Sequence, residues 1–588
     1  MSSLADPERT FDYIVCGGGT SGCVVAGRLA ENKNVTVLLL EAGQHNRDLE
    51  NVHMAGGWSQ NFDSETDWNL VTKPMAGVDS RQVKLSRGRF LGGSSGCNGT
   101  LCIRGSRQDY DDWGLEGWSG HEFFDAMKKS ETFHPKPWFK ADEASHGYSG
   151  PLHTEPHDLA PIADRLIDSF VDQGLPLHHD MFSTGHVPHG CGHVPRTVHK
   201  GVRTTSADFI TKEYDRANIT IQTDATVDRV LLQPSATGPR AVAVAARSAD
   251  GSSKTFHARR EIIVSGGAYC SPAILMRSGI GARDELAQFD INCVIDLPGV
   301  GKNLMDHLIV FMFYEASQPG LTNCAKVYHG DSFDKSYQEY QEHKTGFLST
   351  FPFGSFAFAR IDDRLKDEPL WRDAPRQPGR DPMGLTPKQP NIEFFSTETY
   401  GGPKQYDQFP VNSHAFSIIA ELFAPKSRGT VTLESKDPAV NPVIDCNYLD
   451  HPMDLLVLSE ACRYANEIVM QGAGTRDIVK GSWPPELNHH TYTSREQWIP
   501  YVKHHATTCY HAAGTCAMGK DNNPQAVLDN KLRVRGVSGL RVADCSVMPA
   551  LHGGHTQMPA YGIGERCADF VKETWKLDGL EGRIQSVL

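Results

Sequence analysis

Three glycines near the start of the chain, Gly17, Gly19 and Gly22, have the spacing G-x-G-x-x-G. In such a motif the first glycine permits a tight turn, the second lets the backbone approach a pyrophosphate, and the third lets a helix pack closely on a strand. Glu41 follows 19 residues after Gly22, where a carboxylate accepts hydrogen bonds from ribose hydroxyl groups. The pattern predicts a dinucleotide site. Because Glu41 disfavours a 2′-phosphate, FAD or NAD is favoured over NADP.

The segments around this motif supply the elements that position it. Residues 11–16 (FDYIVC) are typical of a strand, 23–31 of a helix, and 35–40 (VTVLLL) of a second strand buried on both faces, so together they predict a βαβ unit. Further strands are predicted at 219–230, 241–246, 261–265 and 540–543, and helices at 160–175 and 561–575. Segments that resemble strands of an antiparallel sheet lie at 309–314, 392–395, 415–423 and 430–433.

Composition excludes several classes of protein. The 588 residues include 58 Lys and Arg against 71 Asp and Glu, a net charge of −13 that argues against a nucleic-acid partner or an anionic membrane surface. The 14 cysteines contain no C-x-x-C pair, so neither a zinc ribbon nor a thioredoxin-type motif is predicted. No run of 18 apolar residues and no apolar leader is present, so we expect no membrane span, no signal peptide and a cytoplasmic location.

A second glycine-rich run, GRFLGGSSGCN at 88–98, resembles the first signature of the glucose–methanol–choline (GMC) oxidoreductases, which are FAD-dependent. The second signature is matched at 267–281. Further motifs of that family are matched at 299–307, 511–515, 541–546 and 554–559. The matches extend over nearly the whole chain. The sequence is therefore identified as a member of this family, of the alcohol oxidase or dehydrogenase type, with some similarity to the formate oxidase branch.

The predicted elements and the resemblance together imply an α/β fold, α+β overall. We expect a Rossmann-like FAD-binding domain and a substrate-binding domain built on an antiparallel sheet, each discontinuous in the chain. The expected FAD-binding domain comprises 8–160, 215–308 and 522–588, and the expected substrate-binding domain comprises 161–214 and 309–521.

The resemblance also implies which residues hold the cofactor. Glu41 is expected at the adenosine ribose, Val227 near the adenine, Asn98 to Leu101 beside the isoalloxazine, and Asp544 at the ribityl or pyrophosphate end, with a helix cap as its alternative role. The full predicted set is Gly17, Gly19, Thr20, Ser21, Gly22, Glu41, Ala42, Trp68, Leu91, Gly93, Asn98, Gly99, Thr100, Leu101, Val227, Asp544, Thr556 and Gln557. Some relatives link FAD to a histidine of the 88–98 loop. This chain has no histidine there, so non-covalent FAD is predicted.

Two histidines, His511 and His555, fall on matched motif positions and by resemblance converge above the flavin. Oxidation of an alcohol requires a base for the hydroxyl proton and transfer of a hydride to flavin N5. Histidine suits the first task because its ordinary pKa of about 6.5 lies near the working pH. We predict His511 as the base and His555 as the hydrogen-bonding partner that positions the oxygen.

The predicted reaction is oxidation of the CH–OH group of a small primary alcohol, aromatic ones included, or of an aldehyde hydrate, with molecular oxygen or another electron acceptor. Candidate pocket walls are Phe394, Phe395, Tyr400 and Phe423, with packing in the core as the alternative role of each. Formate is a further candidate, although the formate oxidase branch uses an arginine where this chain has His555. A flavin-dependent lyase, cyclase or photodecarboxylase of the same fold stays open as an alternative.

A histidine-rich stretch, residues 178–199, includes six histidines and Cys191. Their spacing fits no regular ligand pattern, so we predict a solvated or interdomain loop and no metal site.

Overall fold

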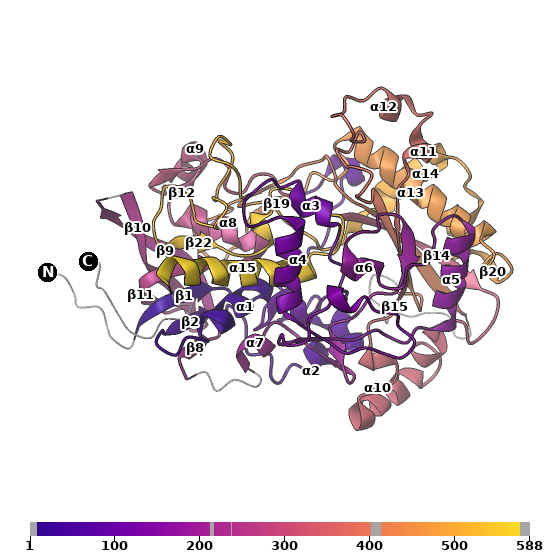
Figure 1. Ribbon diagram of the computed structural model, residues 1–588, viewed down its shortest axis with the longest axis horizontal. Coiled ribbons are helices and arrows are strands. Elements are labelled where there is room, and N and C mark those ends of the chain that lie inside the picture. The colour runs from indigo at the N-terminus through magenta and orange to yellow at the C-terminus, as the bar shows by residue number, and fades with distance from the viewer. Residues whose placement is uncertain (1–8, 212–216, 237, 402–412, 577–588) are drawn as a thin grey trace.

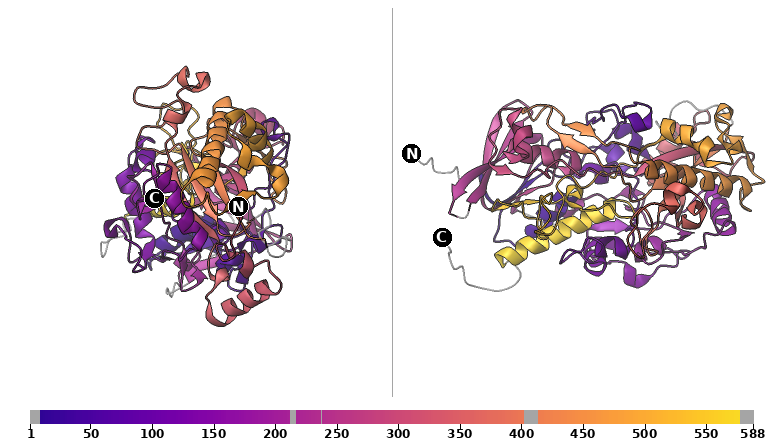
Figure 2. Two further views of the ribbon diagram at one scale, coloured as in Figure 1. Left: turned by 90° about the vertical axis from the view of Figure 1, so that its right-hand side faces the viewer. Right: turned by 90° about the horizontal axis from the view of Figure 1, so that it is seen from above.

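The computed structural model describes residues 9–211, 217–236, 238–401 and 413–576. Two seven-stranded sheets organise the molecule, the first on the left of Figure 1 and the second on the right. Seen from above in Figure 2, the magenta strands of the first sheet lie towards one end and the orange helices of the later chain towards the other. The predicted mixed α/β architecture is confirmed.

The first sheet has a parallel centre and an antiparallel extension. Its strands in spatial order are β8 (Ile219–Gln222), β2 (Val37–Leu40), β1 (Thr10–Cys16), β11 (Ser253–Val264), β10 (Gly238–Ser248) and β9 (Ala225–Ser235), with β22 (Leu540–Val542) also beside β11. The pairs among β8, β2, β1, β11 and β22 are parallel. All four residues of β2 are buried, as expected of a parallel strand covered on both faces.

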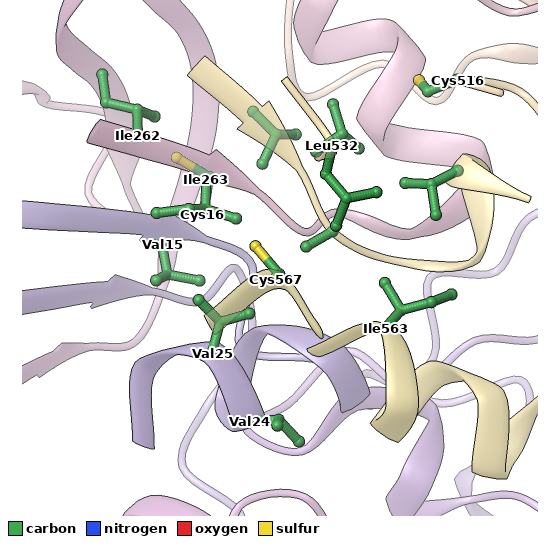
Figure 3. Close-up of a cluster of buried hydrophobic side chains, with 14 of the residues drawn as sticks. Val15, Cys16, Val24, Val25, Ile262, Ile263, Cys516, Leu532, Ile563 and Cys567 are labelled. Carbon is green, nitrogen blue, oxygen red and sulfur yellow. The ribbon is translucent and has the colours of Figure 1, made fainter. Parts of the chain in front are cut away.

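Two helices lie side by side against this sheet, α1 (Thr20–Leu29) and α15 (Gln557–Trp575) (Figure 1). Figure 3 shows Val24 and Val25 of α1 and Ile563 and Cys567 of α15 in one core with residues of β1 and β11. A Cβ on Gly564 would lie 2.7 Å from the Val24 Cβ, so only glycine permits this close helix packing. The packing holds the start of both helices at the same end of the sheet.

The second sheet is antiparallel throughout. Its strands in spatial order are β20 (Val479–Ser482), β14 (Leu308–Ala316), β17 (Ala415–Leu422), β16 (Ile392–Thr397), β15 (Phe353–Ala359) and β5 (Gly190–Gly192), with β21 (Thr507–Thr508) also beside β14. Helices α5 (Pro161–Asp172), α13 (Pro452–Gln471) and α14 (Arg495–His505) contribute to the core on one face. Part of the other face packs against Leu101, Ile103 and Phe182, and the rest of it is available to the site.

The structure corrects three expected elements. Residues 430–433 do not join the antiparallel sheet, because β18 (Thr430–Thr432) pairs with β19 (Val443–Asp445) in a sheet of its own. The single strand expected at 219–230 is interrupted at Asp224, whose φ of 53° ends β8 before the chain turns into β9. Helix α15 begins four residues before the expected start at residue 561.

The two sheets draw on interleaved parts of the chain. The first uses segments within 10–40, 219–264 and 540–542, and the second uses segments within 190–192, 308–422 and 479–508. The domain limits predicted from the sequence stay predictions, and those at 8, 214–215 and 588 lie outside the described residues. Within the described ranges, no helix has both the length and the apolar character needed to cross a membrane.

Candidate functional site

A cavity of about 1070 Å³ connects the ends of the parallel strands to the face of the antiparallel sheet opposite α5, α13 and α14. Its lining includes the ends of β1 and β2, the start of β9, and alternate residues of β14 (Ile309, Phe311 and Phe313). Alternation places every second side chain of a strand on the same face. All predicted cofactor-binding and catalytic residues line this cavity except Gly22, Leu91 and Thr100.

The glycine motif forms the turn between β1 and α1. Gly17 has a φ of +113°, and a Cβ on Gly22 would overlap the carbonyl oxygen of Gly17, so Gly22 shapes the turn without lining the cavity. A Cβ on Gly19 would meet nothing within 4 Å. Helix α1 has no side-chain cap and no acidic residue in its first turn. Its free N–H groups therefore face the cavity as an anion site.

Glu41 is buried beside this turn. One carboxylate oxygen accepts a hydrogen bond from the Gly18 N–H (2.9 Å), and the other accepts one from the Gly43 N–H (2.8 Å). Burial raises the pKa of Glu41 to about 7. The residue therefore orders the glycine turn and also presents its carboxyl group to the cavity, where it lies among the lining residues.

Asp544 caps a short 3₁₀ helix, Cys545–Val547, and accepts a hydrogen bond from the Ser546 N–H at 2.8 Å. Its other oxygen accepts hydrogen bonds from the Gly267 N–H (2.9 Å) and the Ser271 hydroxyl (2.6 Å) at the start of α8 (Gly267–Arg277). The capping role weighed from the sequence is therefore present. Asp544 also lines the cavity, so the two roles do not exclude each other.

Asn98 lies where the predicted isoalloxazine loop meets the start of α15. Its side-chain amide donates a hydrogen bond to Gln557, and its side-chain oxygen accepts one from the Thr100 N–H (2.9 Å). The fully buried Arg203 donates to both the backbone and the side-chain oxygen of Asn98 at 2.8 and 2.9 Å. Thr100 is fully buried outside the cavity lining, with a left-handed φ of 64°, and Leu91 packs against Gly18.

His511 and His555 meet at the far end of the cavity, with ring centroids 4.6 Å apart. His511 follows β21, and its backbone N–H donates to Asp306 at 2.8 Å. The same aspartate accepts hydrogen bonds from the hydroxyls of Thr508 and Tyr448. His555 precedes α15, and its backbone N–H donates to the Ile103 carbonyl. Separate loops therefore deliver the two imidazoles to one place.

Two buried glutamates behind these histidines were missed by sequence reasoning. Glu393 of β16 and Glu421 of β17 are directly paired across the sheet, hydrogen-bonded to each other, and 0% exposed. Glu393 lies 2.7 Å from His555 Nε2, and Glu421 lies 3.3 Å from His511 Nδ1. The available signal was a single acid in each of two apolar strands, IEFFST and AFSIIAEL.

His307, Cys509 and His552 complete this group, which we call the buried histidine cluster (His307, Glu393, Glu421, Cys509, His511, His552, His555). His307 Nδ1 lies 3.0 Å from both His511 Nδ1 and Glu421, and the Cys509 thiol donates to Glu421 at 3.3 Å. Burial raises the pKa of both glutamates well above their ordinary value. It lowers the pKa of His307 and His511 well below theirs, and that of His555 below its own.

The walls beside the two histidines are largely aromatic. The aromatic lining residues there are Trp58, Phe62, Phe311, Phe313, Phe351, Phe353, Phe395 and Tyr510. Of the four predicted walls only Phe395 lines the cavity. Phe394 is on the opposite face of β16 and packs against Phe170 and Tyr464, while Phe423 packs against His307 and Tyr400 against Phe313. Because neighbouring side chains of a strand point to opposite faces of the sheet, Phe394 and Phe395 cannot both line the cavity.

The histidine-rich stretch is partly built into the second sheet rather than a free loop. β5 lies within it and pairs with β15, and His189 accepts a hydrogen bond from the Arg360 N–H at 3.0 Å. His199, at the end of the stretch, lies elsewhere, beside His134 and His153.

Comparison with known proteins identifies the family. The N-terminal model of the GMC oxidoreductases matches residues 11–309, and the C-terminal model matches 425–564. The chain belongs to the GMC oxidoreductase family. Oxygen-dependent choline dehydrogenase of Cronobacter sakazakii is 34% identical over 96% of this chain and 95% of the relative, and the enzyme of Photobacterium profundum is 32% identical over 96% and 93%.

Solved structures of this family have the same fold. Formate oxidase superposes with a TM-score of 0.89 at 30% identity, covering 96% of this chain and 99% of that one. A substituted Aspergillus oryzae formate oxidase, studied for FAD modification, has the same TM-score. A fungal aryl-alcohol oxidase superposes with a TM-score of 0.79 at 25% identity, covering 97% and 100%.

The residues present fit FAD, the cofactor of this family. Gly19 leaves open space for a pyrophosphate beside the start of α1. The 19-residue helix α15 likewise begins at the cavity without a side-chain cap or an acidic first turn, so a second positive helix end faces the same space. Together the two ends favour a long ligand with negative charge distributed along it.

Proposed function

We propose that this oxidoreductase uses FAD to oxidise the CH–OH group of a small primary alcohol, aromatic ones included, or of an aldehyde hydrate. The observation that carries the proposal is the pair His511 and His555, side by side at the aromatic end of the cavity. FAD, when bound, would supply the acceptor for two electrons. The absence of a histidine between residues 87 and 101 supports non-covalent binding.

His511 is the proposed base. Burial lowers its pKa well below 6.5, so the ring is neutral near pH 7 and holds a lone pair for the substrate proton. Its Nδ1 faces Glu421 and His307, which leaves Nε2 for a ligand in the cavity. The neutral His511 ring can therefore accept the hydroxyl proton of an alcohol on its Nε2 atom.

His555 is the proposed hydrogen-bonding partner of the substrate oxygen. Its Nε2 is held by Glu393 at 2.7 Å, which leaves Nδ1 as the other ring atom able to contact a ligand. We propose Glu393 and Glu421 as positioning residues. Since both are enclosed and hydrogen-bonded to each other, at least one of the two carboxyl groups carries a proton. The pair thus links the two imidazoles without adding two negative charges.

The aromatic walls favour an apolar or aromatic substrate. The eight aromatic rings beside the two histidines gain free energy by covering an apolar group, whereas a carboxylate enclosed there must lose its water. Neither glutamate lines the cavity, so neither carboxyl group is in direct contact with a substrate there.

Formate is a second candidate, favoured by the similarity to formate oxidase. Against it, His555 offers one ring nitrogen where an arginine would hold a carboxylate with two parallel hydrogen bonds. The two candidates therefore differ in the substrate group that the same pair of imidazoles must hold.

An anaerobic substrate screen tests the proposal. The purified yellow protein is mixed without oxygen with benzyl-type and short primary alcohols, aldehydes, choline and formate, and the flavin absorbance is followed. Bleaching by an alcohol or aldehyde supports the proposal, and bleaching by formate alone selects the second candidate. No bleaching by any compound overturns both. Admission of oxygen then shows whether oxygen is the acceptor.

A further inference from the structure

Three half-buried histidines outside the cavity form a second group, which we call the outer histidine cluster (His134, His153 and His199). His134 Nε2 and His153 Nδ1 are 2.8 Å apart, at hydrogen-bond distance. The ring centroids of His134 and His199 are 3.7 Å apart. One potential ligand atom from each residue lies within 4.8 Å of the others. Such close convergence of three imidazoles is the donor set of many transition-metal sites.

Backbone hydrogen bonds hold these segments together without a metal. β3 (Glu131–Phe133) is parallel to β4 (Leu152–Thr154), and the His134 N–H donates to the Thr154 carbonyl at 2.8 Å. Glu155 and Arg196 exchange two backbone hydrogen bonds of 3.0 and 2.8 Å, which fix the approach to β6 (Val198–His199). The three imidazoles are therefore brought together by the fold itself, which lowers the entropy lost when a ligand binds.

A carboxylate lies where such a site needs one. Glu155 is 3.2 Å from His199 Nδ1, and both side chains are about one-fifth exposed. Imidazoles that bind metals usually donate their second ring N–H to a carboxylate, which fixes the tautomer and leaves the other nitrogen for the ion. With Glu155 on Nδ1, His199 presents Nε2 as its ligand atom.

We propose that His134, His153 and His199 bind a divalent first-row transition metal ion such as Zn²⁺, with Glu155 orienting His199. The ion takes the position between His134 Nε2 and His153 Nδ1 that a shared proton holds in the metal-free pair. Because both rings bind as neutral imidazoles, that proton moves to the other nitrogen of the ring that carried it. Zn–N bonds of about 2.0–2.1 Å in a tetrahedral site place ligand nitrogens roughly 3.3 Å apart, close to the 2.8 Å of the metal-free pair. The stacked rings must tilt towards a common point as the ion enters.

The outer cluster is better suited to an ion from solution than the buried one. Its residues are half-buried, whereas His307, Glu393 and Glu421 are fully enclosed and already contact one another. Zinc at the buried cluster would occupy His511 or His555 and would stop reduction of the flavin. Zinc at the outer cluster leaves flavin reduction unchanged, so the two locations have different readouts.

Calorimetric titration of the purified full-length chain with ZnCl₂ tests the site. We expect one equivalent to bind, with MgCl₂ giving no comparable heat because imidazole disfavours hard cations. His134→Ala should weaken zinc binding at least tenfold, and Glu155→Gln about tenfold. His121→Ala is the matched control, since that side chain is 80% exposed and lies outside both clusters.

Each other outcome overturns the proposal. The proposed site is contradicted if the wild-type chain does not bind zinc. It is also contradicted if the wild-type chain and His134→Ala bind zinc equally. Loss of binding in His121→Ala as well makes the effect unspecific.

If His134→Ala does not fold, Cu²⁺ and electron paramagnetic resonance on the wild-type chain replace it. Three coupled nitrogens support the site, and fewer than three overturn it. His199→Gln gives the same comparison from another strand.

Discussion

The two histidine clusters hold the same side chain in opposite surroundings. In the buried cluster, His307, His511 and His555 each have a ring nitrogen within 3.3 Å of a carboxyl group or another imidazole. In the outer cluster the rings stack on one another near the surface, with one carboxylate at the edge. Enclosure fixes the proton position of an imidazole, as a base requires, whereas partial exposure leaves it open to ions in solution.

The largest expected difference between the clusters is in flavin reduction. His511→Ala should slow anaerobic reduction by the identified substrate by about 10²- to 10⁴-fold, because the base is lost. The bound flavin, measured from its absorbance, should stay in place. His134→Ala is the matched control and should stay within twofold. Equal effects of the two substitutions would refute the assignment of the base.

Removal of the link behind the base should have the next largest effect. Glu421→Ala leaves a space behind His511 and frees its ring, and a misplaced catalytic group slows reduction by roughly 10- to 100-fold. Glu421→Gln keeps the shape and a hydrogen-bonding group, and should recover most of the rate because burial already favours the uncharged carboxyl. A glutamine variant as slow as the alanine variant would indicate that the negative charge is required.

The pH dependence of flavin reduction should reveal the enclosed base. His511 faces Glu421, His307 and His555, and its pKa lies well below 6.5 because of burial and the neighbouring imidazoles. Only the neutral ring accepts a proton. The reduction rate should therefore still be at its maximum at pH 6.5, and it should fall only when the pH approaches the lowered pKa of His511. A midpoint above pH 6.5, from stopped-flow rates across pH 4–9, would contradict this.

A smaller effect is expected on stability. Burial lowers the pKa of His552 to about 3, while the unfolded imidazole titrates near 6.5. The unfolded chain therefore binds more protons between these values, and the free energy of unfolding falls by up to about 1.4 kcal/mol for each pH unit below 6.5. His552→Gln should flatten the decrease of the melting temperature between pH 6.5 and 4. An unchanged slope would assign acid sensitivity to other groups.

Local sequence predicted the parts of the site that depend on backbone shape. The turn at Gly17 and Gly22 could be anticipated, because only glycine tolerates its positive φ and its close contacts. The strands carrying Phe395 and Glu421 were predicted within a few residues, since apolar strand segments are recognisable locally. The sequence did not predict which face of each strand points to the cavity. Phe394 was therefore predicted as a wall together with Phe395, although only Phe395 lines the cavity.

Sequence by itself determined the family, the glycine turn, the two-sheet architecture and the two histidines at the end of the cavity. All of these depend on short motifs or on the periodicity of neighbouring residues. Only the tertiary structure decided that Glu393 and Glu421 stand behind those histidines, and that His134, His153 and His199 meet. These contacts join residues from 19 to 162 positions apart, through strand pairing and register that no local pattern specifies.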